Sequence, residues 1–368
     1  MGIMTLYLND RRQIEEKTYF RRLLTESSMM GIDAFLFTPE DVHYGEDRIH
    51  AIRYDHRRRR WYRSWTGLPD IIFDRCRYQP TERFQRLKEF RSRYPHLQYL
   101  NRPLSNKWRI HQLFSENPLI KDHLPDTELY SNGKALLDFI AKHGVVFLKP
   151  ITGTGGRGIL RIEELPNRMY RIQGRDANRR IITEQTLSPR ATMLKAQSWV
   201  NGRTYLMQQG IDVTLHNGRV HDFRMLVQKN SEGRWVKTGC AGRIGAARSV
   251  TSNLHGGGTA VEMVSLLKLR FTQDAFIRRI QETAETLAFD IVDQLEQVYG
   301  RLCELALDLA VDPEGHVWLL EINPKPGRNI FLQINDYLSY RTAVIRPLEY
   351  AMWLSKQKSN EHSPGPKN

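Results

Sequence analysis

The stretch FLKPITGTGGRGILRI, residues 147–162, decides the fold of this chain. Its glycines Gly153, Gly155 and Gly158 fit the pattern G-x-G-x-x-G, which several unrelated nucleotide sites share. A dinucleotide-binding fold needs such glycines to open a helix, with an acidic residue about 20 positions later. The residues that follow are instead ILRI, β-branched and largely apolar, which favours a strand. The pattern therefore indicates a strand–loop–strand hairpin and argues against a dinucleotide site.

Two other phosphate-binding loops do not match either. A Walker A loop requires Gly-Lys-Ser/Thr, which is absent here, and the lysine of a protein kinase follows its glycine loop on a later strand. Lys149 instead precedes the loop, at the end of the strand VVFLKP, where its ammonium could reach phosphates. Glycine N–H groups approach phosphate oxygens closely, although a glycine hairpin alone is as often only a tight turn. We predict a flap over a triphosphate, formed by Gly153, Thr154, Gly155, Gly156, Arg157 and Gly158.

A triphosphate site needs Mg²⁺, which prefers carboxylate and carbonyl oxygens. The segment DLAVDPEGHVWLLEIN offers them, because Glu321 and Asn323 lie two apart on one predicted strand and share a face. If the Asp-Pro-Glu-Gly turn pairs Val311 with His316, Asp308 becomes a diagonal neighbour of Glu321 on that face. Two buried carboxylates side by side are costly without a cation between them. We predict a metal site at Asp308, Glu321 and Asn323, with exposure of one carboxylate at a sheet end as the alternative.

The chain divides into three predicted regions and a tail. Residues 1–104 contain the short β-rich runs MTLYLN, DAFLFTP and DIIFDR, which predict a small α/β domain. Residues 105–208 carry the glycine hairpin. Residues 209–355 carry antiparallel strands, one long amphipathic helix at about 265–300, and the predicted metal site. Residues 356–368 are polar and predicted to be disordered, and the chain as a whole is predicted to be α/β (α+β).

The formal net charge of +14 favours an anionic partner. The densest basic cluster is DHRRRRWYR, with Arg57 to Arg60 and Arg63. The simplest interpretation is a solvated, charged edge of the amino-terminal domain. A nucleic-acid partner is not favoured, because no helix-turn-helix, zinc or RNA-binding motif accompanies the cluster.

The cysteines and the hydropathy concern the compartment. Cys76, Cys240 and Cys303 fit no C-x-x-C pattern and indicate buried thiols in a reducing compartment. No apolar run approaches the length of a membrane span, and the first ten residues lack the pattern of a signal peptide. We therefore expect a cytoplasmic protein without a membrane span. Nothing in the sequence indicates an oligomeric state.

Several motifs together resemble one family. NKW, LKPITGTGGRGI, DFRMLVQKN, TSNLHGGG and LLEINPKPGR are similar to the spore-coat-associated YheC/YheD family of ATP-grasp proteins, over roughly Pro69 to Arg328. The resemblance implies two α+β subdomains that clasp ATP, preceded by a small α/β pre-ATP-grasp domain. It also implies a spore association as an alternative to a purely cytoplasmic location. DFRMLV and SNLHGGG further resemble ribosomal-protein glutamate ligases, which join an amino acid to a peptide carboxylate.

The resemblance implies a role for each candidate residue. Lys107 and Lys149 would bind the α and β phosphates, and Asp212 would contact the ribose. The backbone of the hinge would contact adenine, at Gln208, Gln209, Gly210 and Ile211. Two Mg²⁺ ions, or Mn²⁺ as the alternative, would lie at Asp308, Glu321 and Asn323. Phosphoryl transfer or the acyl phosphate would be assisted by Arg224, Arg243 and Asn253.

Simpler interpretations remain open for some of these residues. Arg224 would otherwise form a structural ion pair with Asp222 or another acid, and Gly256, Gly257 and Gly258 would be only a flexible connection. Many amide-forming relatives carry Ser-Pro-Gly or a similar small residue after Glu-x-Asn, whereas this chain has Pro-Lys-Pro-Gly-Arg at 324–328. Its lysine and arginine, Lys325 and Arg328, would then bind an acidic substrate.

The implied reaction is an ATP-dependent ligation. A substrate carboxylate is activated as an acyl phosphate and joined to an amine-type nucleophile, and the partners are ATP and an anionic carboxylate, either an amino acid, a peptide or a polymer. No covalent side-chain nucleophile is needed, and no compelling Ser/His/Asp or Cys/His arrangement is evident. Two other functions are considered: an ATP-binding spore-coat or assembly protein without ligase turnover, and a nucleic-acid-binding protein that uses Arg57 to Arg60.

Overall fold

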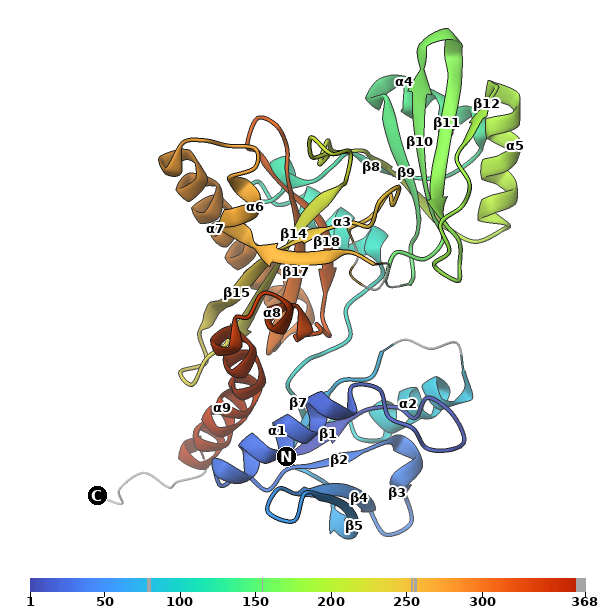
Figure 1. Cartoon of the computed structure of the whole chain (residues 1–368). Coiled ribbons are helices and arrows are strands. Elements are labelled where there is room, and N and C mark those ends of the chain that lie inside the picture. Colours follow the sequence, from blue (N-terminus) through green and yellow to red (C-terminus); the bar gives the residue numbers. More distant parts are fainter. Residues whose placement is uncertain (78–80, 154, 253, 255–256, 362–368) are drawn as a thin grey trace.

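The chain folds around three β-sheets, each with helices packed against it (Figure 1). They are an amino-terminal sheet, a sheet that carries the glycine hairpin, and a carboxy-terminal sheet. This computed structural model describes residues 1–77, 81–153, 155–252, 254 and 257–361.

The amino-terminal sheet combines parallel strands with an antiparallel hairpin. Its order is β3-β4-β2-β1-β6-β7, with β5 paired to the free side of β4. The parallel pairs β1–β2, β1–β6 and β6–β7 form the α/β part, as predicted for this region. The elements are β1 (Gly2–Met4), α1 (Lys17–Met29), β2 (Phe35–Phe37), η1 (Pro39–Asp41), β3 (Val42–His43), β4 (Arg48–Asp55), β5 (Arg60–Gly67), β6 (Ile71–Asp74), α2 (Glu82–Arg93) and β7 (Gln98–Tyr99).

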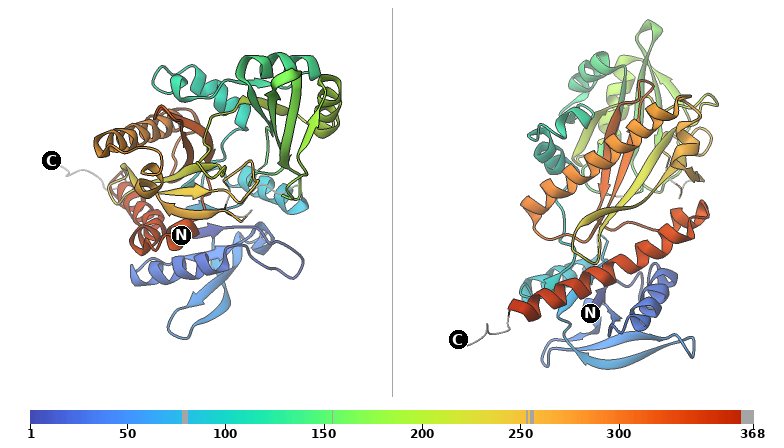
Figure 2. Two further views of the ribbon diagram at one scale, coloured as in Figure 1. Left: turned by 45° about the horizontal axis from the view of Figure 1, so that its top comes forward. Right: turned by 90° about the vertical axis from the view of Figure 1, so that its left-hand side faces the viewer.

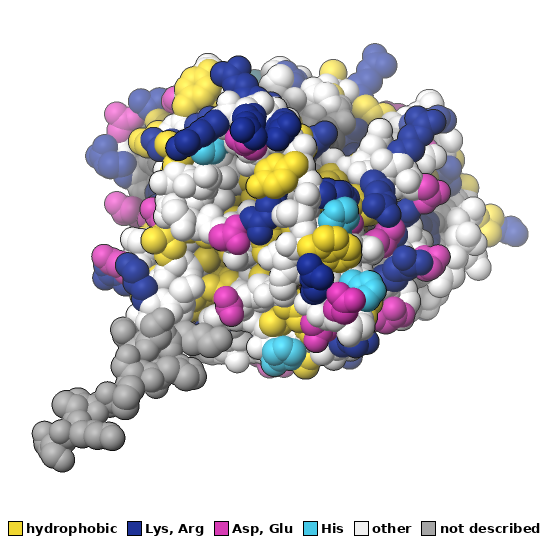
Figure 3. Space-filling model, turned by 90° about the horizontal axis from the view of Figure 1, so that it is seen from below, with side chains coloured by type: hydrophobic (Ala, Val, Ile, Leu, Met, Phe, Trp, Pro, Cys, Tyr) yellow, Lys and Arg dark blue, Asp and Glu magenta, His cyan; other side chains and the backbone are white. Residues whose placement is uncertain are grey.

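The arginine-rich cluster lies at the tip of the β4–β5 hairpin. Arg57, Arg58 and Arg59 form the exposed turn, and Arg60 begins β5. Figure 3 shows the molecule from below, where Lys and Arg side chains lie among hydrophobic and histidine side chains. The cluster is thus a solvated edge of the amino-terminal domain.

The second sheet has the order β12-β11-β10-β9-β13-β8. Strands β9 and β10 pair in antiparallel register, with Leu148 opposite Leu160, so the predicted strand–loop–strand arrangement of the glycine stretch is confirmed. Leu148, Leu160 and Ile162 are buried under α4 and α5, so the alternate residues of β9, Lys149 among them, project from the opposite face. The elements are α3 (Lys107–Ser115), η2 (Lys121–His123), β8 (Thr127–Leu129), α4 (Gly133–His143), β9 (Val145–Pro150), β10 (Ile159–Leu165), η3 (Pro166–Arg168), β11 (Met169–Arg175), β12 (Gln185–Leu187), α5 (Pro189–Val200) and β13 (Tyr205–Gln209).

The carboxy-terminal sheet has the order β16-β15-β14-β17-β18. In β17 the odd-numbered leucines pack into the large core under α7, so the even-numbered residues, Asp308 among them, face the other side. The elements are β14 (His221–Lys229), β15 (Trp235–Ile244), β16 (Thr259–Glu262), α6 (Met263–Leu267), α7 (Asp274–Tyr299), β17 (Glu304–Val311) and β18 (Val317–Asn323).

The single long helix predicted at about 265–300 is wrong. Two helices, α6 and α7, share that segment, and residues 268–273 separate them. Within this break Phe271 is buried in the core, 8% exposed, with its ring 5.4 Å from the ring of Phe276. The apolar spacing is therefore satisfied by two helices that meet at a buried aromatic residue.

The carboxy-terminal helix ties the first domain to the last sheet. After α8 (Asn329–Gln333), α9 (Tyr337–Glu361) runs between the two units (Figure 2). Val344 and Leu348 of α9 pack with Phe20 and Leu23 of α1. The predicted disorder from residue 356 is not seen up to Glu361, since polar helix-forming residues extend an established helix at little cost. Among the described residues, no helix is long and apolar enough to cross a membrane.

Candidate active site

A row of charged side chains crosses the carboxy-terminal sheet, with Asp308 on β17 at its centre. Arg224 on β14 is its direct partner on one side and Glu321 on β18 its direct partner on the other. The sequence predicted a diagonal relation between Asp308 and Glu321, which is wrong. The turn closes on Val311 and Val317, and a bulge shifts the register by one residue between Asp308 and Leu309. The two carboxylates are therefore directly opposite each other.

Two arginines hold Asp308. Arg224 donates from Nε to Oδ1 and from Nη2 to Oδ2, each at 2.8 Å, and Nη2 of Arg243 lies 3.0 Å from Oδ2. Asn323 Nδ2 donates to the same Oδ2 at 3.3 Å. Burial acts to raise the pKa of Asp308, but the two guanidinium groups outweigh it and bring the pKa to about 2. The carboxylate is thus ionised at neutral pH.

The predicted catalytic arginines are engaged with carboxylates. Arg243 is 2% exposed and forms a bidentate pair with Asp222 in addition to its contact with Asp308. Arg224 pairs with Asp308 and not with Asp222. The structure thus brings both arginines to the same face as the predicted metal ligands. Asn253, the third predicted catalytic residue, lies outside the described residues.

Two lysines face the carboxylates from other elements. Lys107 begins α3, whose start is fixed by the Asn106 side chain accepting the N–H of Arg109 at 3.1 Å. Its Nζ lies 3.5 Å from Glu321 Oε1, and its backbone N–H donates to Ile151 after β9. The first turn of α3 therefore contacts both the glycine hairpin, at Ile151, and strand β18, at Glu321.

Lys149 ends β9 on the face opposite to α4 and α5. Its Nζ donates to Gln208 Oε1 at 2.5 Å. Burial, and then the nearby charge of Lys107, lower the pKa of Lys149 to about 8, against the opposing effect of Glu321 and other carboxylates. Gln208 was predicted to contribute only its backbone. No pattern in the sequence indicates that its side chain is the partner of Lys149.

The glycine hairpin has the backbone that only glycine adopts readily. Gly155, Gly156 and Gly158 have φ of 73°, 70° and 65°. The carbonyl of Gly158 accepts a hydrogen bond from Trp199 Nε1 at 3.1 Å, which ties the base of the loop to α5. Thr154 lies outside the described residues.

The comparisons with known proteins bear on this arrangement. A sequence model described as YheC/D like ATP-grasp matches residues 96–354, well over half of the chain. This protein belongs to that family. The endospore coat-associated protein YheD of Bacillus subtilis (strain 168) is 27% identical over 347 residues, which cover 93% of this chain and 75% of that protein. The endospore coat-associated protein YheC of the same organism is 27% identical over 378 residues, which cover 98% of this chain and 97% of that protein.

Solved structures show the same ATP-grasp fold. D-cycloserine synthetase DcsG superposes with a TM-score of 0.55 at 14% identity, covering 95% of this chain and 100% of that one. The ATP-grasp ligase PsnB, complexed with minimal precursor, has a TM-score of 0.52 at 11% identity and covers 94% and 98%. The second and third sheets are thus the two ATP-grasp subdomains, and the amino-terminal α/β domain precedes them.

The predicted ATP-grasp hinge follows β13. The N–H of Gln209 donates to Asp126 and the N–H of Gly210 donates to Val145, each at 2.8 Å, so neither N–H is free for a base. Asp212 is exposed, and its Oδ1 accepts the N–H of Thr214 at 2.9 Å.

The residues fit a magnesium ion that a nucleotide helps to hold. Among the described residues, no group of three or more His, Cys, Asp or Glu side chains is placed to hold a metal alone. Mg²⁺, however, commonly takes one or two carboxylates and completes its shell with phosphate oxygens and water. Glu321 is 30% exposed and its Oε1 lies 3.5 Å from Lys107 Nζ, and Asp308 and Asn323 add oxygens beside it. The donor set is of the type that Mg²⁺ prefers.

Lys325 and Arg328 do not face this site, and their predicted contact with an acidic substrate is not supported. Lys325 Nζ lies 2.8 Å from Asp74 Oδ1 in the amino-terminal domain. Arg328 is 3% exposed and pairs with Glu304, which also binds Arg75 at 2.7 Å. Both side chains are paired with carboxylates inside the protein. The sequence contains no local signal for these contacts.

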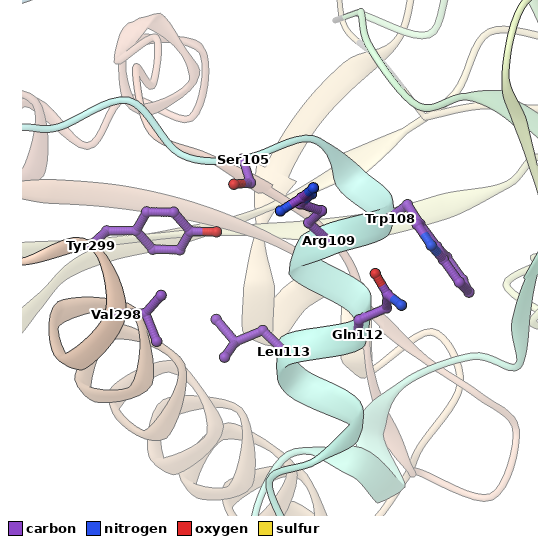
Figure 4. A pocket seen from close by; sticks show the side chains of 7 residues that line it. All are labelled: Ser105, Trp108, Arg109, Gln112, Leu113, Val298 and Tyr299. Atoms are coloured by element: carbon purple, nitrogen blue, oxygen red, sulfur yellow. The ribbon is translucent and has the colours of Figure 1, made fainter.

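A separate open pocket of about 540 Å³ lies between α3 and the end of α7 (Figure 4). It contains none of the lysines or carboxylates described above, so it is not the candidate nucleotide site. Its lining residues are Ser105, Trp108, Arg109, Gln112, Leu113, Val298 and Tyr299.

Proposed function

We propose that this protein is an ATP-dependent ligase that activates a substrate carboxylate as an acyl phosphate and joins it to an amine-type nucleophile. One observation carries the proposal. Lys107 of α3 lies 3.5 Å from Glu321, which stands directly opposite Asp308, and the charges of both carboxylates act on Lys149 of β9. This is an arrangement of cations around two carboxylates and an amide that suits a metal-bound triphosphate.

Each part of the arrangement has a task in this reaction. Lys107 and Lys149 bind the phosphates, and the glycine backbone approaches them from above. Asp308, Glu321 and Asn323 would hold Mg²⁺, or Mn²⁺ in its place. The bound ion supplies neutralisation of the charge that develops on the phosphate oxygens.

The chemistry balances without a protein nucleophile. An oxygen of the substrate carboxylate attacks the γ-phosphorus, the bond to the bridging oxygen breaks, and ADP leaves. The amine nitrogen then attacks the acyl carbon, the carbon–oxygen bond to phosphate breaks, and the amine gives up a proton. The protein's residues position the groups and balance their charge, with Arg224 beside the transferring phosphoryl group.

An ADP-release assay tests the proposal. Purified protein is mixed with Mg·ATP and a panel of amino acids, acidic peptides and amines, and products are identified by mass spectrometry. Turnover that requires both a carboxylate and an amine supports a ligase. The matched variants are Glu321→Gln, expected to lose turnover, and Glu314→Gln on the exposed turn of the same hairpin, expected to keep it.

A second function rests on the similarity to endospore coat-associated proteins. In that case the chain binds ATP and works by assembly on a spore surface, without ligation. Nucleotide binding with no ADP release across the whole panel would favour it. Where the protein resides, in the cytoplasm or in association with a spore, belongs to the same proposal and is tested by fractionation.

A further inference from the structure

Four arginines are buried among the described residues: Arg75, Arg175, Arg243 and Arg328. Three of them pair with carboxylates. Arg175, at the end of β11 and 3% exposed, has no carboxylate partner among the described residues. Its Nε donates to the carbonyl of Arg179 at 3.2 Å and its Nη1 to Thr251 Oγ1 at 3.3 Å, both neutral acceptors. A buried guanidinium without a counter-charge is expensive unless a ligand supplies one.

Arg179 adds a second guanidinium next to the glycine hairpin. Its Nε is buried and has no hydrogen-bond partner in the part of the chain that the structure describes. Its backbone is left-handed, with φ 68°, in a turn that the carboxylate of Asp176 closes by accepting the N–H groups of Asn178 and Arg180, each at 2.8 Å. A left-handed arginine is unfavourable by about 1 kcal/mol, and here the turn fixes it. The turn thereby directs the side chain onto the glycine hairpin.

The guanidinium of Arg179 lies directly against Gly155. A Cβ placed on this glycine would be 2.8 Å from Nη2 of the arginine. Burial, and then the neighbouring charges of Arg157 and Arg175, lower the pKa of Arg179. The described carboxylate that opposes this effect is Glu15, and it already pairs with Arg77 at 2.7 Å.

These arginines share a face with the phosphate lysine. Lys149 follows Leu148, which pairs with Leu160 on β10. Ile159, the residue before Leu160, pairs with Arg175 on β11. Side chains alternate along strands, so Lys149 and Arg175 both project away from α4 and α5. Two strand spacings separate them, about 10 Å. Arg175 therefore lies on the same face of the sheet as the proposed triphosphate position, but too far from Lys149 to share one phosphate with it.

We propose that Arg175 and Arg179 form a second anion site, which binds further acidic groups of the substrate while one carboxylate is activated at the γ-phosphate. This inference rests on the proposed function. The reaction consumes one carboxylate at the phosphates, so two more cations imply a substrate with at least two acidic groups. Guanidinium groups bind carboxylates in two-point contacts, and the occupant is therefore an acidic, glutamate- or aspartate-rich peptide segment.

The test measures binding of two probes, a tetraglutamate peptide and a non-hydrolysable ATP analogue with Mg²⁺. The variant Arg179→Gln keeps the buried Arg175 and the predicted flap residue Arg157, and circular dichroism checks that it is folded. Arg190→Gln, at the exposed start of α5 on the other face of the sheet, is the matched control. We expect nucleotide-loaded Arg179→Gln to bind tetraglutamate at least about ten-fold more weakly than wild type, which corresponds to about 1.4 kcal/mol. We expect an unchanged affinity for the ATP analogue.

Each other outcome overturns the inference. An equal loss of affinity for the ATP analogue would assign the arginines to the triphosphate. Wild type that binds tetraglutamate no better than tetraglutamine would remove the acidic occupant. Failure of the proposed function looks different, because arginine-dependent tetraglutamate binding without any ADP release would keep the anion site and reject the ligase.

Discussion

The pKa of Lys149 leads to a quantitative prediction for nucleotide binding. Burial and the charge of Lys107 lower that pKa from its ordinary 10.5 to about 8. A bound phosphate places negative charge beside the ammonium and favours its protonated form. Nucleotide binding should therefore take up a proton, and affinity should fall as the pH rises through 8.

The size of the effect follows from the two pKa values. At pH 7 the free Lys149 is about nine-tenths protonated, and at pH 9 only about one-tenth. If bound phosphate restores the ordinary pKa of 10.5, the apparent Kd rises about ten-fold between pH 7 and pH 9, or about 1.4 kcal/mol. The phosphates of ADP are already ionised over this range and contribute little.

Isothermal titration calorimetry of Mg·ADP at pH 7, 8 and 9 measures this change, and buffers of different ionisation enthalpy report the proton uptake directly. Lys149→Met should bind weakly and without pH dependence. Lys134→Met, at an exposed position of α4 on the other face, should behave as wild type. Equal Kd values at pH 7 and pH 9 in wild type, or a pH dependence that survives in Lys149→Met, would refute the reasoning.

Three further variants test the site and its support. Glu321→Gln should abolish Mg²⁺-dependent ADP release and leave the melting temperature within about 3 °C of wild type, and full activity would sink the metal assignment. Gly210→Ala would put a Cβ 2.5 Å from Val145 Cγ1, so chemical denaturation should show a loss of about 1–3 kcal/mol. Lys325→Met removes a partner of the buried Asp74 carboxylate, and the free energy of unfolding at pH 7 should fall by about 2 kcal/mol; unchanged stability would mean that the pair contributes nothing.

Local patterns in the sequence were enough for the parts of the site that lie on one hairpin. The glycines and the apolar run after Gly158 predict the β9–β10 hairpin, and the Glu-x-Asn spacing puts Glu321 and Asn323 on one face. The predicted partner of Asp308 was wrong by two residues, one because the turn closes on Val311 and Val317 and one because of the bulge. A β-bulge leaves no mark in a hydrophobic pattern, because the residues on both sides of it still alternate.

Partners far apart in the chain could not be predicted. Arg224 was assigned a catalytic role with an ion pair as the alternative, and only the strand order β14–β17 places it against Asp308, 84 residues away. The break between α6 and α7 was missed because the same apolar spacing serves one helix or two. In both cases tertiary packing chooses between local possibilities that are nearly equal in free energy.

The amino-terminal domain takes part in shaping the site. The loop that follows Asn323 is held by that domain at successive carbonyls: Asn101 donates to Pro324 at 3.1 Å, and Arg75 donates to Pro326 at 2.9 Å. Lys325 between them pairs with an aspartate of β6. Because these contacts begin directly after the last predicted metal ligand, the first domain limits how far the end of β18 can move. The Pro-Lys-Pro-Gly-Arg sequence, which departs from the small residues of many amide-forming relatives, is thus explained by domain attachment and requires no contact with substrate.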